Sequence, residues 1–258
     1  MESLKGKVVI ITGASSGLGA SMAVLFAKRG CRLSLTGRKQ ENLAAVAKQT
    51  GLGNDKMLTA IGDLRKAEFR KTLIFRTIEK YGKIDVLINN ASVLYVSPLE
   101  KLPEEQFDEI LDINLKSHVF LTKLALPHLL ETKGNVINIS SAITDIVVEG
   151  WGAYIMSKAA LDSFTEVLAD ELGPFGVRVN ALNPGPLPST NLYTRSNYVE
   201  LTGKQLSKMF EDMYAKTPLR RECLPDEIAQ VATFLASDMA SFVHGETLRA
   251  DGGIRFNA

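Results

Sequence analysis

The chain has 258 residues, a net charge of +1 and 23% charged residues. A charge so close to zero argues against nucleic acid or an anionic membrane surface as a partner. The two cysteines, Cys31 and Cys223, match no metal-ligand spacing, so we expect no metal site and a reducing, cytoplasmic location. Strand-like sequence begins by Lys7 and no apolar stretch reaches the ~18 residues of a membrane helix, so neither a signal peptide nor a membrane span is expected.

The chain opens with the pattern of a strand, a glycine-rich turn and a helix. Residues 8–11 are a β-branched run typical of a strand buried on both faces, and apolar residues recur at helical spacing over residues 18–26. Gly13 and Gly17 lie between them and Gly19 lies in the first helical turn, in the context of a dinucleotide-binding turn, where free N–H groups at the helix start attract a pyrophosphate. The alternative is a purely structural turn.

Strand-like and helix-like segments then alternate to the end of the chain. Further strands are expected at residues 32–36, 57–61, 86–88, 135–140, 178–182 and 246–250. Helices are expected at residues 41–49, 66–81, 103–130, 153–172 and 225–236. This alternation predicts a single α/β domain over residues 1–258, with a Rossmann-like, doubly wound parallel sheet of about seven strands and helices on both faces.

Polar residues and glycines follow most of the predicted strands. Ligands of such sheets bind outside the carboxyl ends of the strands. The segments concerned are Gly37-Arg38, Asp63-Leu64, Asn89-Asn90-Ala91, Ser140-Ser141 and Asn183-Pro184-Gly185. Their recurrence predicts a binding site along one edge of the sheet, although each alone is ordinary turn chemistry.

Tyr154 and Lys158 are one helical turn apart and therefore share a helix face. A neighbouring cation favours the phenolate, so Lys158 is expected to lower the pKa of Tyr154 from its usual value of about 10. A tyrosine tuned in this way can exchange a proton with a carbonyl or alcohol oxygen near neutral pH, with Ser141 holding that oxygen. The alternative for the pair alone is a surface contact.

These segments, in this order and over essentially the whole chain, resemble the short-chain dehydrogenase/reductase family. The resemblance implies a nicotinamide cofactor and an active site of Asn114, Ser141, Tyr154 and Lys158. Tyr154 would be the acid/base, Ser141 would orient the substrate oxygen, and Lys158 would bind the nicotinamide ribose. Asn114 would hold a water that links Lys158 to solvent, unless it merely bonds its own helix backbone.

The same resemblance assigns residues to the cofactor. They are Gly13, Ser15, Ser16, Gly17, Leu18, Gly19, Arg38, Asp63, Leu64, Asn90, Ala91, Tyr154, Lys158, Pro184, Gly185 and Leu187. Two departures from the family pattern stand out: Ser92 follows Asn89-Asn90-Ala91 where glycine is usual, and residues 186–190 are richer in proline than usual. Because of the second departure, either Ser189 or Thr190 could contact the nicotinamide amide.

The residues after the second strand favour NADP(H) over NAD(H). NAD-binding sites usually place an acid there, whereas this chain has Gly37, Arg38 and Lys39. We expect Gly37 to leave space for the 2′-phosphate and Arg38 to pair with it. The alternative is a solvated basic helix start.

Residues 191–217 interrupt the alternation and resemble the variable substrate lid of the family. Apolar side chains are expected to line a substrate pocket there and nearby: Val93, Leu94, Tyr95, Val147, Trp151, Leu192, Tyr193, Tyr198, Leu201, Met209, Phe210, Met213 and Tyr214. Such a pocket suits a medium-sized hydrophobic ketone or secondary alcohol, as in a carbonyl reductase. The lid also carries charged side chains of both signs, Arg195, Glu200, Lys204, Lys208 and Glu211.

Alternatives to this function are a 3-oxoacyl thioester reductase and a non-catalytic NADP-binding regulator. The helix at residues 153–172 carries more apolar residues than one buried stripe needs, namely Ile155, Ala159, Phe164, Val167 and Leu168. Together with the resemblance, this predicts a homo-oligomer, either a dimer or a tetramer.

Overall fold

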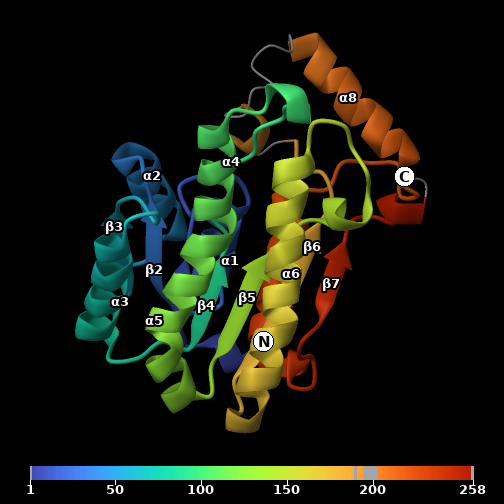
Figure 1. Ribbon diagram of the computed structural model, residues 1–258. Coiled ribbons are helices and arrows are strands. Elements are labelled where there is room, and N and C mark those ends of the chain that lie inside the picture. The colour runs from blue at the N-terminus through green and yellow to red at the C-terminus, as the bar shows by residue number, and fades with distance from the viewer. Residues whose placement is uncertain (1, 189–190, 195–202, 257–258) are drawn as a thin grey trace.

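The computed structural model describes residues 2–188, 191–194 and 203–256. Its centre is a seven-stranded parallel sheet of order β3-β2-β1-β4-β5-β6-β7 (Figure 1). The strands are β1 (Val8–Ile11), β2 (Arg32–Gly37), β3 (Met57–Ile61), β4 (Val86–Asn89), β5 (Asn135–Ile139), β6 (Arg178–Pro184) and β7 (Thr247–Ala250). The predicted fold class is confirmed, and β6 runs further than expected because Pro184 still pairs with Ala250.

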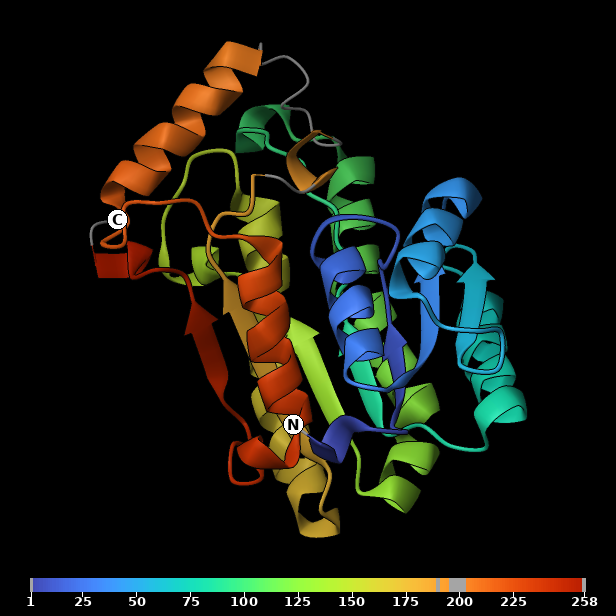
Figure 2. The same cartoon turned by 180° about the vertical axis from the view of Figure 1, so that it is seen from behind.

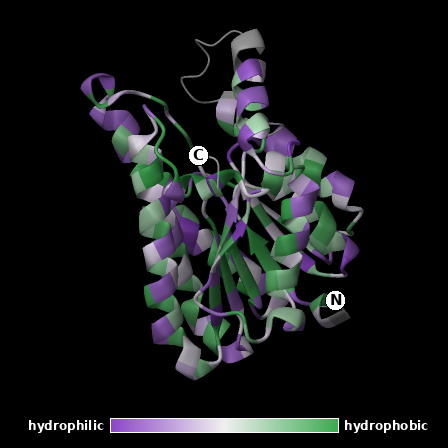
Figure 3. Cartoon of the chain, turned by 90° about the vertical axis from the view of Figure 1, so that its right-hand side faces the viewer, coloured by the Kyte–Doolittle hydropathy of each residue, from purple (hydrophilic) through white to green (hydrophobic). Residues whose placement is uncertain are grey.

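Helices cover both faces of the sheet. One face carries α1 (Gly17–Lys28), α2 (Gln40–Thr50) and α9 (Pro225–Ala236), seen in front in Figure 2. The other carries α3 (Ala67–Tyr81), α4 (Glu104–Leu111), α5 (Ser117–Thr132) and α6 (Gly152–Leu172), seen in front in Figure 1. The side view in Figure 3 shows the mostly hydrophobic strands between the two helical layers. The central strands β1, β4 and β5 are therefore buried on both faces, as their apolar runs require, whereas the edge strands β3 and β7 are only partly buried.

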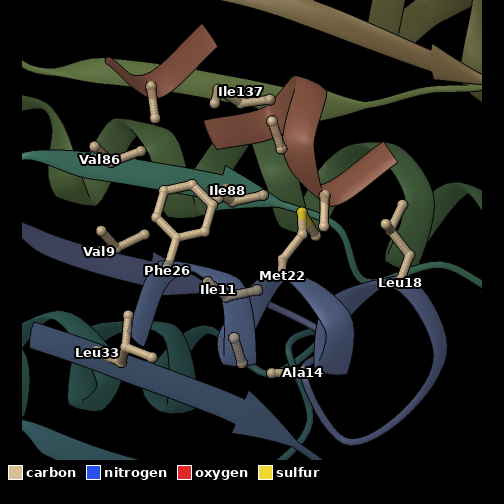
Figure 4. Packing of buried hydrophobic residues seen from close by; sticks show 14 of the residues in the cluster. Val9, Ile11, Ala14, Leu18, Met22, Phe26, Leu33, Val86, Ile88 and Ile137 are labelled. Atoms are coloured by element: carbon tan, nitrogen blue, oxygen red, sulfur yellow. The ribbon is translucent and has the colours of Figure 1, made fainter. Parts of the chain in front are cut away.

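The position of α1 over the sheet is fixed by its buried apolar stripe. Met22 and Phe26 point from α1 toward β1 and β4, where they pack near Ile11 and Ile88, and Leu18 belongs to the same buried cluster (Figure 4). Met22 and Phe26 are fully buried. Because interiors are close-packed, this contact holds the N-terminus of α1 rigidly at the carboxyl ends of the strands.

The region predicted as one helix over residues 103–130 contains a widened turn. A π-helical segment, Asp112–Lys116, lies between α4 and α5 and joins them into one continuous helical stretch. A wide turn of this kind shifts which side chains face inward, and it is frequent at functional sites. Here it includes Asn114, which is fully buried.

The predicted lid lies beyond the carboxyl ends of the strands. It contains α7 (Asn191–Thr194) and α8 (Gly203–Lys216), and α8 stands at the top of Figure 1. Several residues named for this region lie outside the described residues: Ser189, Thr190, Arg195, Tyr198, Glu200 and Leu201. The side chain of Lys204 is likewise outside the described part of the chain.

Candidate active site

A cavity of about 470 Å³ opens at the carboxyl ends of the strands. It lies where the strand order reverses, between β1 and β4, which is the usual ligand site of such sheets. The cavity is lined by every residue predicted to bind the cofactor, and also by Ser141. Asn114 does not line it. The structure thus brings the predicted residues together, while their roles remain predictions.

The glycine-rich turn is locked to the segment after β4. The Thr12 hydroxyl accepts hydrogen bonds from the backbone N–H groups of Asn90 (2.8 Å) and Ala91 (3.0 Å). In return, the Asn90 side chain donates to the Thr12 carbonyl at 2.7 Å. Gly13 has φ +65°, and a Cβ there would lie 2.8 Å from the Ala91 Cα. A glycine is therefore required where these two segments touch.

The N-terminus of α1 faces the cavity with its backbone donors available. Ser16 precedes the helix in an extended conformation, and its side chain makes no capping hydrogen bond. The first turn contains no acidic residue, and Gly17 and Leu18 line the cavity. Helix N–H groups and the positive end of the helix dipole both favour an anion at this position. This end of α1 fits the pyrophosphate of a dinucleotide.

Tyr154 lies on α6 with only 4% of its surface exposed. The Ser92 and Ser141 side chains lie close to its hydroxyl and act on its pKa as hydrogen-bonding groups. Burial raises the pKa of Tyr154 to about 12, and the two serine hydrogen bonds only partly offset this. The Tyr154–Lys158 pair alone predicted a lowered pKa, whereas the pKa is raised. The reason is that removing the phenol from water has a larger effect on its pKa than the neighbouring groups have.

Lys158 is buried beneath Tyr154. Its Nζ lies 5.6 Å from the centre of the Tyr154 ring and donates a hydrogen bond to the Ile139 carbonyl at 2.8 Å. Burial lowers the pKa of Lys158 to about 7, against the opposing effect of the Asp162 carboxylate. Burial therefore opposes a permanent positive charge on Lys158 beside the phenol.

Asn114 anchors the loop after β4 rather than its own helix. Its Oδ1 accepts from the backbone N–H of Val93 at 2.8 Å and from the Ser92 hydroxyl at 3.1 Å. Its Nδ2 donates to the Val93 carbonyl at 2.9 Å and to the Ser157 hydroxyl at 3.1 Å. The alternative in which Asn114 bonds its own helix is wrong, and its four bonds tie together three segments around Tyr154.

At the opposite end of the cavity, charged side chains pair with one another. The Arg38 guanidinium lies 3.7 Å from the carboxylate of Glu109, and Arg65 contacts both Glu109 (3.3 Å) and Asp63 (2.6 Å). The Tyr95 hydroxyl donates to the other oxygen of Glu109 at 2.6 Å. The hydrogen bond from Arg65 is the main cause of the lowered pKa of Asp63. Arg38 is therefore shared with a carboxylate on α4.

Three of these residues were not foreseen as charged partners. Glu109 and Arg65 belong to no motif, and Tyr95 was expected only as part of an apolar wall. Gly37 lines the cavity beside Arg38, and that it leaves space for a phosphate stays a prediction. A Cβ at Gly37 would lie 2.9 Å from the Ser15 Cβ, so the glycine is also needed where β2 meets the glycine-rich turn.

An apolar cluster adjoins Tyr154 on the side of the lid. Its buried members are Leu94, Ile143, Trp151, Tyr154, Tyr193 and Phe210. The Trp151 ring meets the Tyr154 ring edge-on, with 5.9 Å between their centroids. Leu192, Met209, Met213 and Tyr214 pack around this cluster as expected. The prediction for Val147 is wrong, since its side chain is fully exposed.

Among the described residues, no group of histidine, cysteine and acidic side chains is placed to hold a metal ion. None of the helices in residues 2–188, 191–194 and 203–256 is long and apolar enough to span a membrane.

Comparisons with known proteins agree with this architecture. The family model described as Enoyl-(Acyl carrier protein) reductase matches residues 13–255. A 3-oxoacyl-acyl-carrier-protein reductase from Thermotoga maritima is 32% identical, over 97% of this chain and 98% of its own length. An NAD-dependent glycerol dehydrogenase from Listeria innocua is 35% identical, over 96% of this chain and 93% of its own.

A solved structure extends the agreement to three dimensions. A short-chain dehydrogenase/reductase of unknown function from Caenorhabditis elegans, determined with cofactor, superimposes with a TM-score of 0.90 at 29% identity. The match covers 99% of this chain and 97% of the other. The chain therefore belongs to the short-chain dehydrogenase/reductase family of oxidoreductases, which use a nicotinamide cofactor.

Proposed function

We propose that the protein is an NADP(H)-preferring oxidoreductase that interconverts a medium-sized hydrophobic ketone and the corresponding secondary alcohol. The observation that carries this proposal is the setting of the Tyr154 hydroxyl. It lies beside the Ser141 hydroxyl in the wall of the cavity, and its ring belongs to an apolar cluster with Trp151 and Tyr193. Two hydroxyls next to an apolar surface can hold the oxygen of a carbonyl compound whose body is hydrophobic.

The chemistry follows from these positions. When bound, the nicotinamide supplies the hydride to the carbonyl carbon or accepts it from the alcohol carbon. In reduction, Tyr154 donates its proton to the carbonyl oxygen, and Ser141 donates a hydrogen bond to the same oxygen. In oxidation, Tyr154 accepts that proton back. Since the pKa of Lys158 is about 7, Lys158 can take up or release a proton close to the tyrosine at neutral pH.

The binding groups fit a dinucleotide with a 2′-phosphate. The N-terminus of α1 offers backbone donors to a pyrophosphate, and Lys158 lies in the same cavity for the nicotinamide ribose. Arg38 lines the opposite end and is 48% exposed, so it can turn toward a phosphate. The preference for NADP(H) over NAD(H) is graded rather than absolute, because the Glu109 carboxylate pairs with the same Arg38 guanidinium.

A 3-oxoacyl thioester is the second candidate substrate. The similarity to the Thermotoga maritima 3-oxoacyl-acyl-carrier-protein reductase favours it. A thioester carries the same reducible ketone, but it needs a longer channel and a carrier that docks at the mouth of the cavity. The two candidates are distinguished by comparing simple ketones with 3-oxoacyl thioesters of the same chain length.

The deciding experiment is a panel of aromatic and aliphatic ketones, secondary alcohols and 3-oxoacyl thioesters. Each is assayed with NADPH, NADH and their oxidised forms, and nicotinamide absorbance is followed. We expect turnover of hydrophobic ketones with NADPH, and a smaller Kd for NADPH than for NADH. Turnover confined to thioesters would replace the first candidate with the second. If no compound reacts although NADPH binds, the protein is a non-catalytic cofactor-binding regulator.

We also infer a homo-oligomer in the cytoplasm, with residues 191–217 acting as a lid over the substrate. On α6, Val167 is 58% exposed and Met156 is 51% exposed, which leaves apolar surface for a second copy. Leu168 is instead buried, and Phe164 packs against the core of its own chain. Light scattering at micromolar concentration should give a dimer or tetramer mass, and a monomer alone would contradict the assembly.

A further inference from the structure

The segment that follows β4 places a serine against the acid/base tyrosine. Ser92 and Tyr154 both line the cavity, and the Ser92 hydroxyl is close enough to the Tyr154 hydroxyl to lower its pKa as a hydrogen-bonding group. The same Ser92 hydroxyl lies 3.1 Å from Oδ1 of the fully buried Asn114. Ser92 therefore stands between Tyr154 and Asn114 as a direct side-chain link. The family usually has glycine at this position, which has no group to form such a link.

The partners of Asn114 fix the direction of these hydrogen bonds. The backbone N–H of Val93 can only donate, so the amide atom 2.8 Å from it must be the oxygen. The Val93 carbonyl can only accept, so the atom 2.9 Å from it must be the nitrogen. The Ser92 hydroxyl consequently faces an oxygen. With its single proton on Asn114, the Ser92 oxygen is left to accept the proton of the neutral Tyr154 hydroxyl.

The same arrangement also serves the ionised tyrosine. A hydroxyl proton rotates freely to its best acceptor, so Ser92 can turn its proton from Asn114 to a phenolate. Asn114 Oδ1 then still accepts from the Val93 N–H, and no buried polar atom loses its last partner. Ser92 can therefore accept from Tyr154 in one protonation state and donate to it in the other, without moving any heavy atom.

We propose that Ser92 is a positioning residue for Tyr154, which holds the hydroxyl by accepting from the phenol and donating to the phenolate, with Asn114 as its anchor. The inference rests on the proposed acid/base function of Tyr154. It assigns Asn114 a different task from holding a water, since Asn114 orients Ser92. It also gives the two serines different roles: Ser141 faces the substrate oxygen, and Ser92, on the loop after β4, positions the tyrosine.

Other titratable groups line the same cavity or act on Lys158, and they must be considered for any pH effect. They are Lys158 and Asp162 on α6, His118 on α5, Tyr95 on the same loop as Ser92, and Tyr193 on α7. Burial lowers the pKa of His118 to about 3, so His118 stays neutral, and burial lowers the pKa of Lys158 to about 7. Replacing Ser92 leaves all five side chains in place, so a change at Tyr154 can be attributed to the lost hydroxyl.

The test titrates Tyr154 without requiring turnover. Protein labelled with 3-fluorotyrosine is saturated with NADP⁺, and the fluorine signal of Tyr154, assigned by its loss in Tyr154→Phe, is followed against pH. In Ser92→Ala and Ser92→Gly the Tyr154 pKa should rise by about 1 unit, because the phenolate loses one hydrogen bond to a charged group. Ser92→Thr, which keeps the hydroxyl, should retain the parent pKa, as should Ser97→Ala further along the same loop.

Two results would overturn the inference: an unchanged Tyr154 pKa in both Ser92→Ala and Ser92→Gly, or an equal shift in Ser92→Thr. A steady-state readout adds a second test with the best substrate of the panel. The Ser92→Ala variant should lose kcat while keeping its Kd for NADPH, and its pH–rate curve for alcohol oxidation should move to higher pH. Failure of the whole panel would remove the proposed function but would leave the titration interpretable, so the two outcomes are distinguishable.

Discussion

The two ends of the cavity are built from different interactions. At the Tyr154 end, Tyr154 and Lys158 are 4% and 1% exposed, and their polar atoms bond to neutral partners of the protein. At the Arg38 end, Arg38 is 48% exposed and pairs with the Glu109 carboxylate. Buried hydrogen bonds are costly to break, whereas exposed ion pairs contribute only about 0–1 kcal/mol and weaken in salt. We therefore expect all-or-none effects at the first end and graded ones at the second.

The largest effect is expected from Tyr154→Phe. The ring keeps its edge-on contact with Trp151, and only the titrating hydroxyl of the tyrosine is removed. Turnover should fall by about 10²–10⁴-fold, which is the usual contribution of a general acid or base. The Kd for NADPH should stay close to that of the parent, and fluorescence titration measures it independently of turnover. A kcat within about tenfold of the parent would show that Tyr154 is not the acid/base, and the expected difference between the two ends of the cavity would then not hold.

Lys158→Met should damage both turnover and cofactor affinity, and it also has a consequence for stability. Because burial depresses the pKa of Lys158 to about 7 from 10.5, the unfolded chain binds more protons than the folded one between these values. The free energy of unfolding of the parent should therefore rise with pH across this window through Lys158. The methionine variant should lack that rise and gain stability relative to the parent most clearly at the low-pH end.

Urea unfolding of Lys158→Met and the parent at several pH values measures this difference. Comparing the two chains cancels the titration of all other groups. Parallel stability curves would show that Lys158 is not held largely uncharged in the folded protein. Such a result would instead favour the permanent cation beside Tyr154 that the sequence alone predicts.

At the Arg38 end, Arg38→Ala should weaken NADP(H) binding by one to two decades, since a hydrogen bond to a charged group contributes roughly 1.5–3 kcal/mol. Binding of NAD(H), which lacks the 2′-phosphate, should change little. Dissociation constants for both cofactors at two salt concentrations decide this, and the loss should shrink at high salt. Equal affinity of the parent for both cofactors would reduce Arg38 to a solvated charge.

Adding Gly37→Asp to Arg38→Ala is a less clean route to NAD(H) preference. An acid at the end of β2 would suit the ribose hydroxyls of NAD(H). However, a Cβ at Gly37 would lie 2.9 Å from the Ser15 Cβ, so the glycine-rich turn must move to admit it. We therefore expect the double variant to lose affinity for both cofactors, which the same titrations would reveal.

The sheet and the Tyr154 end could be predicted because their signals are local. A buried parallel strand requires a continuous apolar run, as in β1, and a turn that touches a neighbouring strand requires a glycine, as at Gly13. One helical turn between Tyr154 and Lys158 likewise fixes their relative position. The direction of the Tyr154 pKa could not be predicted in the same way, because it depends on how completely the folded chain excludes water from the phenol.

The features that were missed depend on contacts between distant segments. Glu109 meets Arg38 only because α4 lies beside the carboxyl end of β2, and no periodic pattern marks a partly buried carboxylate as a partner. The π turn around Asn114 coincides with hydrogen bonds from its side chain to Val93, which no helix propensity encodes. Val147 was expected inside from its apolar character, although single apolar residues are common on protein surfaces.

The smallest effect is expected from Glu109→Gln, and it has the opposite sign. The Glu109 carboxylate, held in place by the Tyr95 hydroxyl at 2.6 Å, competes with a 2′-phosphate for Arg38. Removing its charge should tighten NADP(H) binding by up to about fivefold, the equivalent of about 1 kcal/mol for one exposed pair, with little change for NAD(H). Glu104→Gln removes the same charge from the exposed start of α4 and serves as the control. Equal tightening in both variants would show only a general field effect, whereas weaker NADP(H) binding in Glu109→Gln would mean that Glu109 positions Arg38 for the phosphate instead of competing with it.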